Sequence, residues 1–188
     1  MNLFKKSLLL FIPVALMAGC KNDEENVDPS DPNEAITTAT LTLTNRATPT
    51  ESVTATIDNL NTTADLSKAM LNLKANTTYT GVVTLLDRTK NPTLDVSNQI
   101  KTEANEHLFV YTYTAATGPA TALTITATDK DTNPAPGPYS LGLTTEMKTG
   151  AAGTGKLKLV LRHQPNAKNG TPAPGTTDLD TDFSVIIN

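Results

Sequence analysis

The sequence predicts an all-β protein, a single antiparallel β-sandwich with one short inserted helix. Apolar and polar residues alternate with a period of two over much of residues 35–188, as in strands that bury one face. Threonine, a β-branched residue that favours half-buried pleated surfaces, occurs 34 times among the 188 residues. Only six aromatic residues lie beyond position 34 and tryptophan is absent, so the predicted core is aliphatic.

The chain begins with a segment typical of a signal peptide, which we assign to residues 1–19. Lys5 and Lys6 precede an apolar stretch of twelve residues, 7–18. That stretch is shorter than the ~20 apolar residues needed to span a bilayer, but it has the length of a signal-peptide core. The following residues, Met17-Ala18-Gly19-Cys20, resemble the lipobox of bacterial lipoproteins. The resemblance implies that Cys20, the only cysteine, is acylated and becomes the first residue of the mature chain.

Residues 20–34 are predicted to be the lipidated cysteine followed by an acidic, disordered tether. This segment contains six acidic residues, two prolines and a single apolar side chain, Val27. Fully extended, it reaches roughly 45–50 Å from the lipid. Acidic residues directly behind the cysteine resemble the surface-export signal of Bacteroidota lipoproteins, which implies a lipid anchor in the outer membrane with the domain facing the cell exterior. The alternatives are a charged spacer with no export role, and a periplasmic face.

The charge balance excludes several classes of partner. The formal net charge of the whole chain is −4, and removal of residues 1–19, whose only charged side chains are Lys5 and Lys6, changes it to −6. An acidic domain argues against binding to nucleic acid and against electrostatic attachment to anionic lipid. A single cysteine rules out a disulfide within the chain.

The remaining chain, 35–188, is predicted to be one sandwich domain of seven or eight strands. Turn residues of the types Gly, Pro, Asn and Asp separate the alternating segments. These segments are 36–44, 52–57, 81–86, 108–114, 120–128, 156–163 and 178–187.

One motif refines the fold class. Leu73, Thr77 and Tyr79 match the Leu-x-Pro-x-Thr-x-Tyr corner of fibronectin type III and related Ig-like modules, with Ala75 in place of the proline. The resemblance implies an Ig-like sandwich in which the Tyr79 hydroxyl ties the start of a strand to the preceding loop. The alternative is a chance spacing, and the strand-like residues after Tyr79 favour the corner.

A helix of about three turns is predicted between Pro92 and Leu108. Val96, Ile100 and Ala104 recur every fourth residue, and Thr93 or Asp95 is a suitable first residue. A helix inserted in a small β-domain caps an open end of the sandwich, and partner binding is the alternative role.

The two histidines are candidate metal ligands. Glu103 and His107 have a spacing of four residues, so they share a face if the helix extends that far. His163 ends a strand in phase with its buried leucines. If the three side chains converge, they suit zinc or copper. The alternative is that one histidine caps the helix and the other is buried and hydrogen-bonded, with no metal bound. We therefore expect that the chain requires no cofactor, and a bound divalent metal is the possibility that the histidines leave open.

Acidic residues alternate with other residues in two segments, and the first of these segments resembles a calcium-binding loop. Asp129, Asp131 and Asn133 alternate as in calcium loops, although Pro134 replaces the turn glycine of an EF-hand. The alternative interpretation is a polar turn. Asp178 belongs to the second pattern, which also includes positions 180 and 182, and here the period of two places all three side chains on the solvent face of the last strand.

No catalytic motif is present, so we expect a protein that is not an enzyme. Segments 141–155, 161–166 and 76–79, together with Glu106-His107, resemble small Bacteroidota lipoproteins associated with TonB-dependent outer-membrane receptors. The resemblance implies an accessory ligand- or receptor-binding module for outer-membrane uptake, with such a receptor as partner. A metal-binding lipoprotein and a structural or adhesive surface module are the alternatives.

Overall fold

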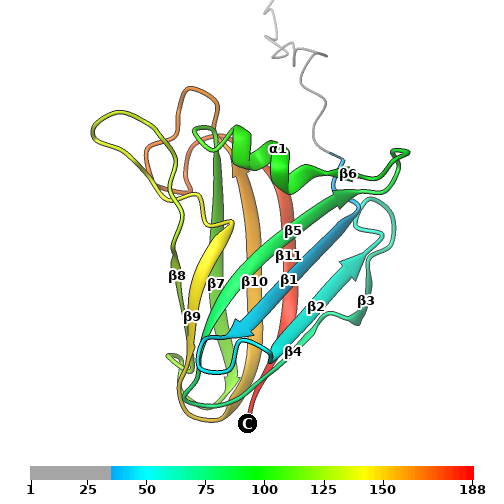
Figure 1. Cartoon of the computed structure of the whole chain (residues 1–188), viewed down its shortest axis with the longest axis vertical. Helices are drawn as coiled ribbons and strands as arrows, with labels where there is room; N and C mark the ends of the chain where they lie inside the picture. The colour runs from blue at the N-terminus through cyan, green and yellow to red at the C-terminus, as the bar shows by residue number, and fades with distance from the viewer. Residues whose placement is uncertain (1–34) are drawn as a thin grey trace, which may run out of the picture. The chain divides into compact units, whose positions relative to one another are not determined.

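Eleven strands and one helix make up the regular structure of residues 35–188, the part of the chain that the computed structural model describes (Figure 1). The first half contains β1 (Thr38–Asn45), β2 (Ser52–Asp58), β3 (Asp65–Lys68), β4 (Met70–Leu73), β5 (Thr78–Asp87), β6 (Leu94–Asp95) and α1 (Val96–Thr102). The second half contains β7 (His107–Thr117), β8 (Leu123–Ala127), β9 (Thr144–Thr149), β10 (Gly153–His163) and β11 (Thr176–Ile187). The predicted signal peptide (1–19) and the segment from Cys20 to residue 34 lie outside the described residues.

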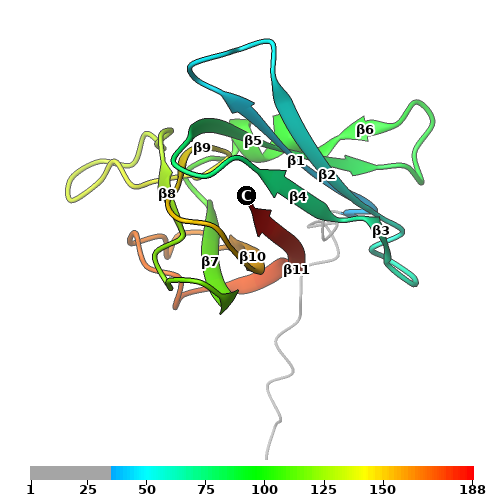
Figure 2. The same ribbon diagram turned by 90° about the horizontal axis from the view of Figure 1, so that it is seen from below.

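The strands form two sheets, and this confirms the predicted all-β sandwich. Sheet A has the order β3-β2-β1-β5-β9-β8, with β6 added beside β5, and sheet B has the order β4-β11-β10-β7. All pairs of strands are antiparallel except β4 with β11. The chain crosses between the two sheets repeatedly, since β4 and β7 of sheet B each lie in sequence between strands of sheet A, and the final pair β10 and β11 belongs to sheet B (Figure 2).

Alternation along the strands builds the core. In β1, Ala39, Leu41 and Leu43 are fully buried, while Thr40 and Thr42 face outward. These two threonines lie opposite threonines of β2, and their hydroxyl groups are 3.1 and 3.3 Å from their partners. The inner residues of both sheets form one cluster whose largest fully buried members are aliphatic apart from a single phenylalanine. The composition therefore predicts the character of the core correctly.

The corner residues have the contacts that the motif predicts. Leu73 and Tyr79 are buried, and the Tyr79 hydroxyl accepts a hydrogen bond of 2.9 Å from the Lys74 amide. The Thr77 amide donates to the hydroxyl of Thr149, which binds the carbonyl of Lys74 in turn. These bonds tie the start of β5 to the loop that precedes it.

The helix is shorter than predicted. It begins after Asp95, whose carboxylate accepts from the Asn98 amide, and it ends at Thr102 rather than near Ala104. Beyond Thr102 the backbone is held by another part of the chain, because the Ala104 carbonyl accepts a hydrogen bond from Lys168. The helix lies across one end of the sandwich with Val96, Ser97 and Ile100 buried (Figure 1). It is not long and apolar enough to cross a membrane, and it is the only helix within the described range.

The alternating pattern finds every long strand except β9. It also misses the three short strands β3, β4 and β6. In β9 the buried side chains are Thr145, Met147 and Thr149, so two of the three inward positions carry a polar residue. The β3 residues are all exposed, which leaves no apolar periodicity to detect.

Candidate metal centre

The two histidines meet at one end of sheet B. His107 is the first residue of β7 and His163 is the last of β10, and the antiparallel register places them directly opposite each other. Their rings stack with centroids 4.8 Å apart and planes inclined by 9°. The His107 side chain is 1% exposed and that of His163 is 17% exposed, so the pair is largely removed from water.

Asp178 joins the histidines because β11 contains a bulge. Leu161 of β10 pairs with Leu179, whereas the next residue, Arg162, pairs with Thr177, so Asp178 is an extra residue on β11. An extra residue interrupts the alternation and redirects a side chain. The Asp178 side chain is consequently only 5% exposed, and its Oδ2 lies 4.0 Å from Nε2 of His107.

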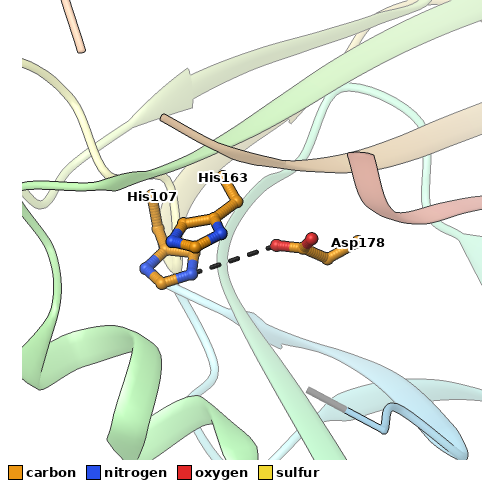
Figure 3. Close-up of side chains that lie close together, drawn as sticks. All are labelled: His107, His163 and Asp178. Carbon is orange, nitrogen blue, oxygen red and sulfur yellow. Dashed lines mark ion pairs between the residues drawn. The ribbon is translucent and has the colours of Figure 1, made fainter. Parts of the chain in front are cut away.

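Three neighbouring strands therefore direct three ligand-type side chains to one point (Figure 3). One nitrogen or oxygen atom from each of His107, His163 and Asp178 lies within 4.8 Å of the others. In Figure 3 one ring nitrogen of each histidine is on the side of the Asp178 carboxylate. This is the one such group of three His, Cys, Asp or Glu residues found within residues 35–188.

The other nitrogen of each ring lies beside an oxygen atom of the segment 103–106. Nδ1 of His107 lies 3.1 Å from the backbone carbonyl of Glu103. A carbonyl only accepts, so Nδ1 carries the proton and the lone pair of the neutral ring is on Nε2, the atom that faces Asp178. Nε2 of His163 lies 3.7 Å from a carboxylate oxygen of Glu106. Histidines that bind metals in proteins are held in this way by carbonyls and carboxylates.

The electrostatics favour a neutral ligand. Burial lowers the pKa of His107 below its usual value, and the neighbouring His163 lowers it further. The Glu103 carbonyl and the Asp178 carboxylate act in the opposite direction without reversing the shift. At neutral pH His107 is therefore uncharged, which is the form that binds a metal ion.

The donor set fits a divalent transition metal. Two imidazoles and one carboxylate suit Zn²⁺ or Cu²⁺ and leave a coordination position open. An equilateral triangle with the 4.8 Å limit as its edge has a centre about 2.8 Å from each corner, whereas Zn²⁺ binds such atoms at ~2.0–2.2 Å. Binding of an ion at these distances would therefore require small rotations of the side chains.

The structure corrects one predicted ligand and adds another. The side chain of Glu103 does not belong to the cluster, because α1 ends at Thr102 and Glu103 contributes its backbone carbonyl instead. Asp178 is the ligand that sequence reasoning missed, since the period of two assigns it to the solvent face. The residue pattern gives no indication of the bulge in β11 that redirects this side chain.

The contacts of Asp129, Asp131 and Asn133 argue against the predicted calcium loop. The carboxylate of Asp129 accepts from the amides of Gly142 and Thr144. Asp131 accepts from the side chain of Asn133 and contacts the Lys168 ammonium at 2.9 Å. The loop thus supplies its own donors, and a lysine occupies the place beside Asp131 where a cation would bind.

Comparisons with models of protein families, with curated proteins and with solved structures yield no match. The geometry of the residues therefore carries the functional argument.

Proposed function

We propose that this chain is a non-catalytic lipoprotein that binds a transition-metal ion, zinc or copper, through His107, His163 and Asp178. The observation that carries the proposal is the convergence of these side chains from three adjacent strands, with ring nitrogens directed to a buried carboxylate. Two imidazoles and a carboxylate are ligand types that zinc and copper accept in proteins.

A hollow at the protein surface lies beside the cluster. The Glu106 side chain is 42% exposed and lines a hollow of about 430 Å³ at the surface, so the cluster lies close to solvent on this side. Glu103 lines the same hollow, together with Lys101 and Lys130.

The proposed location follows from the sequence. The resemblance of the Cys20 segment to a lipobox, and of the acidic tether to a surface-export signal, supports a proposed location on the outer membrane with the domain facing the exterior. A metal-binding module there fits an accessory role in uptake, in which the domain presents the ion to an outer-membrane receptor of the TonB-dependent type. Cell-surface exposure is tested separately, by protease treatment of intact cells.

Metal titration of wild-type protein tests the proposal. The protein is produced without a polyhistidine tag, and Zn²⁺ and Cu²⁺ are titrated by calorimetry at pH 7.5. We expect one site per chain with a dissociation constant in the micromolar range or below. Mg²⁺ and Ca²⁺, which prefer oxygen ligands, are expected not to bind. Absence of binding at micromolar zinc and copper contradicts the proposal.

A matched pair of substitutions assigns the site. Asp178→Asn removes the charge of the ligand, whereas Asp180→Asn makes the same change two residues later on β11, where the side chain is 53% exposed. We expect D178N to weaken zinc binding at least ~10-fold, since even indirect partners of metal ligands contribute that much. D180N is expected to bind as the wild type does. Equal weakening in both variants would show that the metal binds elsewhere.

A further inference from the structure

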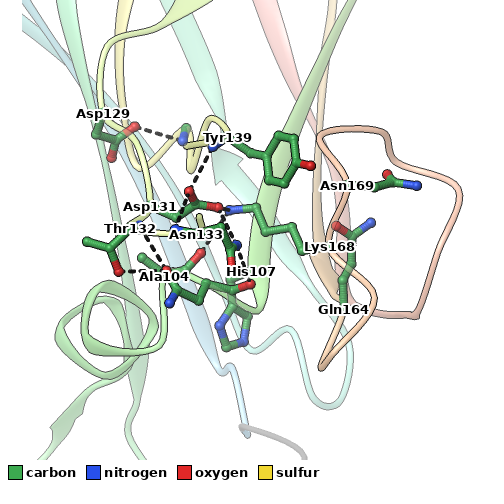
Figure 4. Close-up of polar contacts among 12 residues, drawn as sticks. Ala104, His107, Asp129, Asp131, Thr132, Asn133, Tyr139, Gln164, Lys168 and Asn169 are labelled. Atoms are coloured by element: carbon green, nitrogen blue, oxygen red, sulfur yellow. Dashed lines mark hydrogen bonds and ion pairs between the residues drawn. The ribbon is translucent and has the colours of Figure 1, made fainter. Parts of the chain in front are cut away.

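A second cluster of buried polar side chains lies where two long loops meet (Figure 4). Lys168 comes from the loop between β10 and β11, and Asp131 and Asn133 come from the loop between β8 and β9. The side chains of Lys168 and Asp131 are 1% and 0% exposed. The cluster is separate from the three proposed metal ligands, and the proposed function does not use it.

One carboxylate oxygen connects the other two side chains. Oδ2 of Asp131 lies 2.9 Å from Nζ of Lys168 and accepts a 2.8 Å hydrogen bond from Nδ2 of Asn133. The lysine amine and the asparagine amide nitrogen are therefore no further apart than the sum of these two distances. The amide of Tyr139 donates to the other oxygen, Oδ1, which fixes the carboxylate between the amine and the amide.

These groups have the chemistry of a nucleophile, a proton carrier and an acyl donor. An amine attacks an amide carbon only when it is unprotonated, and burial lowers the pKa of Lys168 below its usual value. Burial acts to raise the pKa of Asp131, but hydrogen bonds from Lys168, Asn133 and the backbone outweigh it and hold the pKa below its usual range, so Asp131 is an ionised carboxylate with oxygens that can accept a proton. Burial of the amine and the carboxylate limits competition from water.

We propose that Lys168 and Asn133 form an intramolecular isopeptide bond with the assistance of Asp131. The lone pair of Nζ attacks Cγ of Asn133, and Asp131 accepts the proton that Nζ releases. Asp131 then delivers this proton to Nδ2, the Cγ–Nδ2 bond breaks, and ammonia leaves. The new bond joins Nζ to Cγ, and Asp131 is restored as a carboxylate.

The sequence around Asn133 suppresses a competing reaction. An asparagine side chain is ordinarily attacked by the backbone nitrogen of the next residue, which leads to deamidation. Here the next residue is Pro134, whose nitrogen carries no hydrogen. The Asn133 amide is thereby preserved for attack by the lysine.

The bond would join the two loops covalently beside the segment that leads into His107, one of the proposed metal ligands. Lys168 also donates a 2.8 Å hydrogen bond to the Ala104 carbonyl, and Asn133 donates to the carbonyl of Asn105. The segment that follows, Glu106-His107, contains a proposed metal ligand.

Peptide mass spectrometry of the wild-type chain tests the inference. Trypsin cleavage after Lys130, Lys148 and Arg162 releases residues 131–148 and 163–188. We expect these two peptides as one linked species, lighter than their sum by one ammonia molecule and uncleaved after Lys168. Recovery of separate peptides 131–148, 163–168 and 169–188 overturns the inference. A linked species that has lost water overturns it as well, because the bond would then involve Asp131.

Variants assign the roles of the residues. Asp131→Asn retains both reacting groups but removes the proton carrier, and we expect it to yield unlinked peptides. Asn133→Ala removes the acyl donor and is expected to give the same result. Asn169→Ala changes an asparagine directly beside Lys168 and is expected to leave the link intact. A link that survives in D131N or N133A contradicts the assignment, and circular dichroism establishes that each variant is folded.

Discussion

At the residue scale, a single extra residue in β11 decides the chemistry of the candidate site. Regular alternation would direct Asp178 to solvent together with Asp180, whose side chain is 53% exposed. The bulge instead buries Asp178 beside the two histidines. The hydrogen bond from His107 to the Glu103 carbonyl then sets which ring nitrogen faces the carboxylate.

The lowered pKa of His107 predicts a pH-dependent stability of the metal-free domain. The unfolded chain, in which the pKa of histidine is ~6.5, binds more protons than the folded domain once the pH falls below that value. The stabilisation is therefore present above pH ~6.5 and is lost as the pH falls towards the folded-state pKa of His107.

Urea unfolding between pH 7.5 and 5, with a chelator present, measures this dependence. We expect the free energy of unfolding to decrease towards pH 5, and His107→Gln to decrease less steeply. His163 is present in both proteins, so the difference reports on His107. Identical slopes in the two proteins would show that His107 is not held in its neutral form.

At the element scale, hydrogen bonds made by side chains near the ends of strands and of the helix determine where these elements begin and end. The Tyr79 hydroxyl and Thr149 tie the loop before β5 to the sheet, and Asp95 caps α1. The sequence predicts the corner and the start of the helix because their signals are local. It does not predict the end of the helix, because the bond from Lys168 to Ala104 spans 64 residues.

Two tyrosines allow a controlled test of the corner. Tyr79→Phe removes the hydrogen-bond partner of the Lys74 amide, and we expect it to destabilise the domain by ~0.5–1.5 kcal/mol. Tyr113→Phe removes a buried hydroxyl that has no hydrogen-bond partner within the described residues, so we expect little or no loss. Urea unfolding of both variants measures the difference. Equal losses would show that the Tyr79 hydrogen bond contributes nothing specific.

At the scale of the whole molecule, the sandwich brings together residues that are far apart in the sequence. His107, His163 and Asp178 occupy β7, β10 and β11, three successive strands of sheet B. The alternating pattern is sufficient to predict the two-sheet architecture and the inward direction of His163. It does not specify which strands are neighbours, so the meeting of the histidines follows only from the strand order.

A metal that bridges three strands should stabilise the whole domain. A ligand that binds only the folded state contributes about 2.7 kcal/mol when its free concentration is 100 times the dissociation constant. For a domain of this size we expect the melting temperature to rise by about 5–10 °C. Thermal unfolding followed by circular dichroism tests this, with D178N in zinc and the wild type in calcium as controls. A similar rise in either control would indicate a nonspecific effect of divalent ions.

The central claim is that a metal ion binds between His107, His163 and Asp178, and anomalous X-ray diffraction tests it most directly. Crystals of the wild-type protein are grown with one equivalent of zinc, and data are collected on both sides of the zinc absorption edge. We predict an anomalous peak in contact with a nitrogen of each histidine and an oxygen of Asp178, at ~2.0–2.2 Å from each. A zinc-loaded crystal with its strongest peak elsewhere and none between these three side chains would contradict the claim.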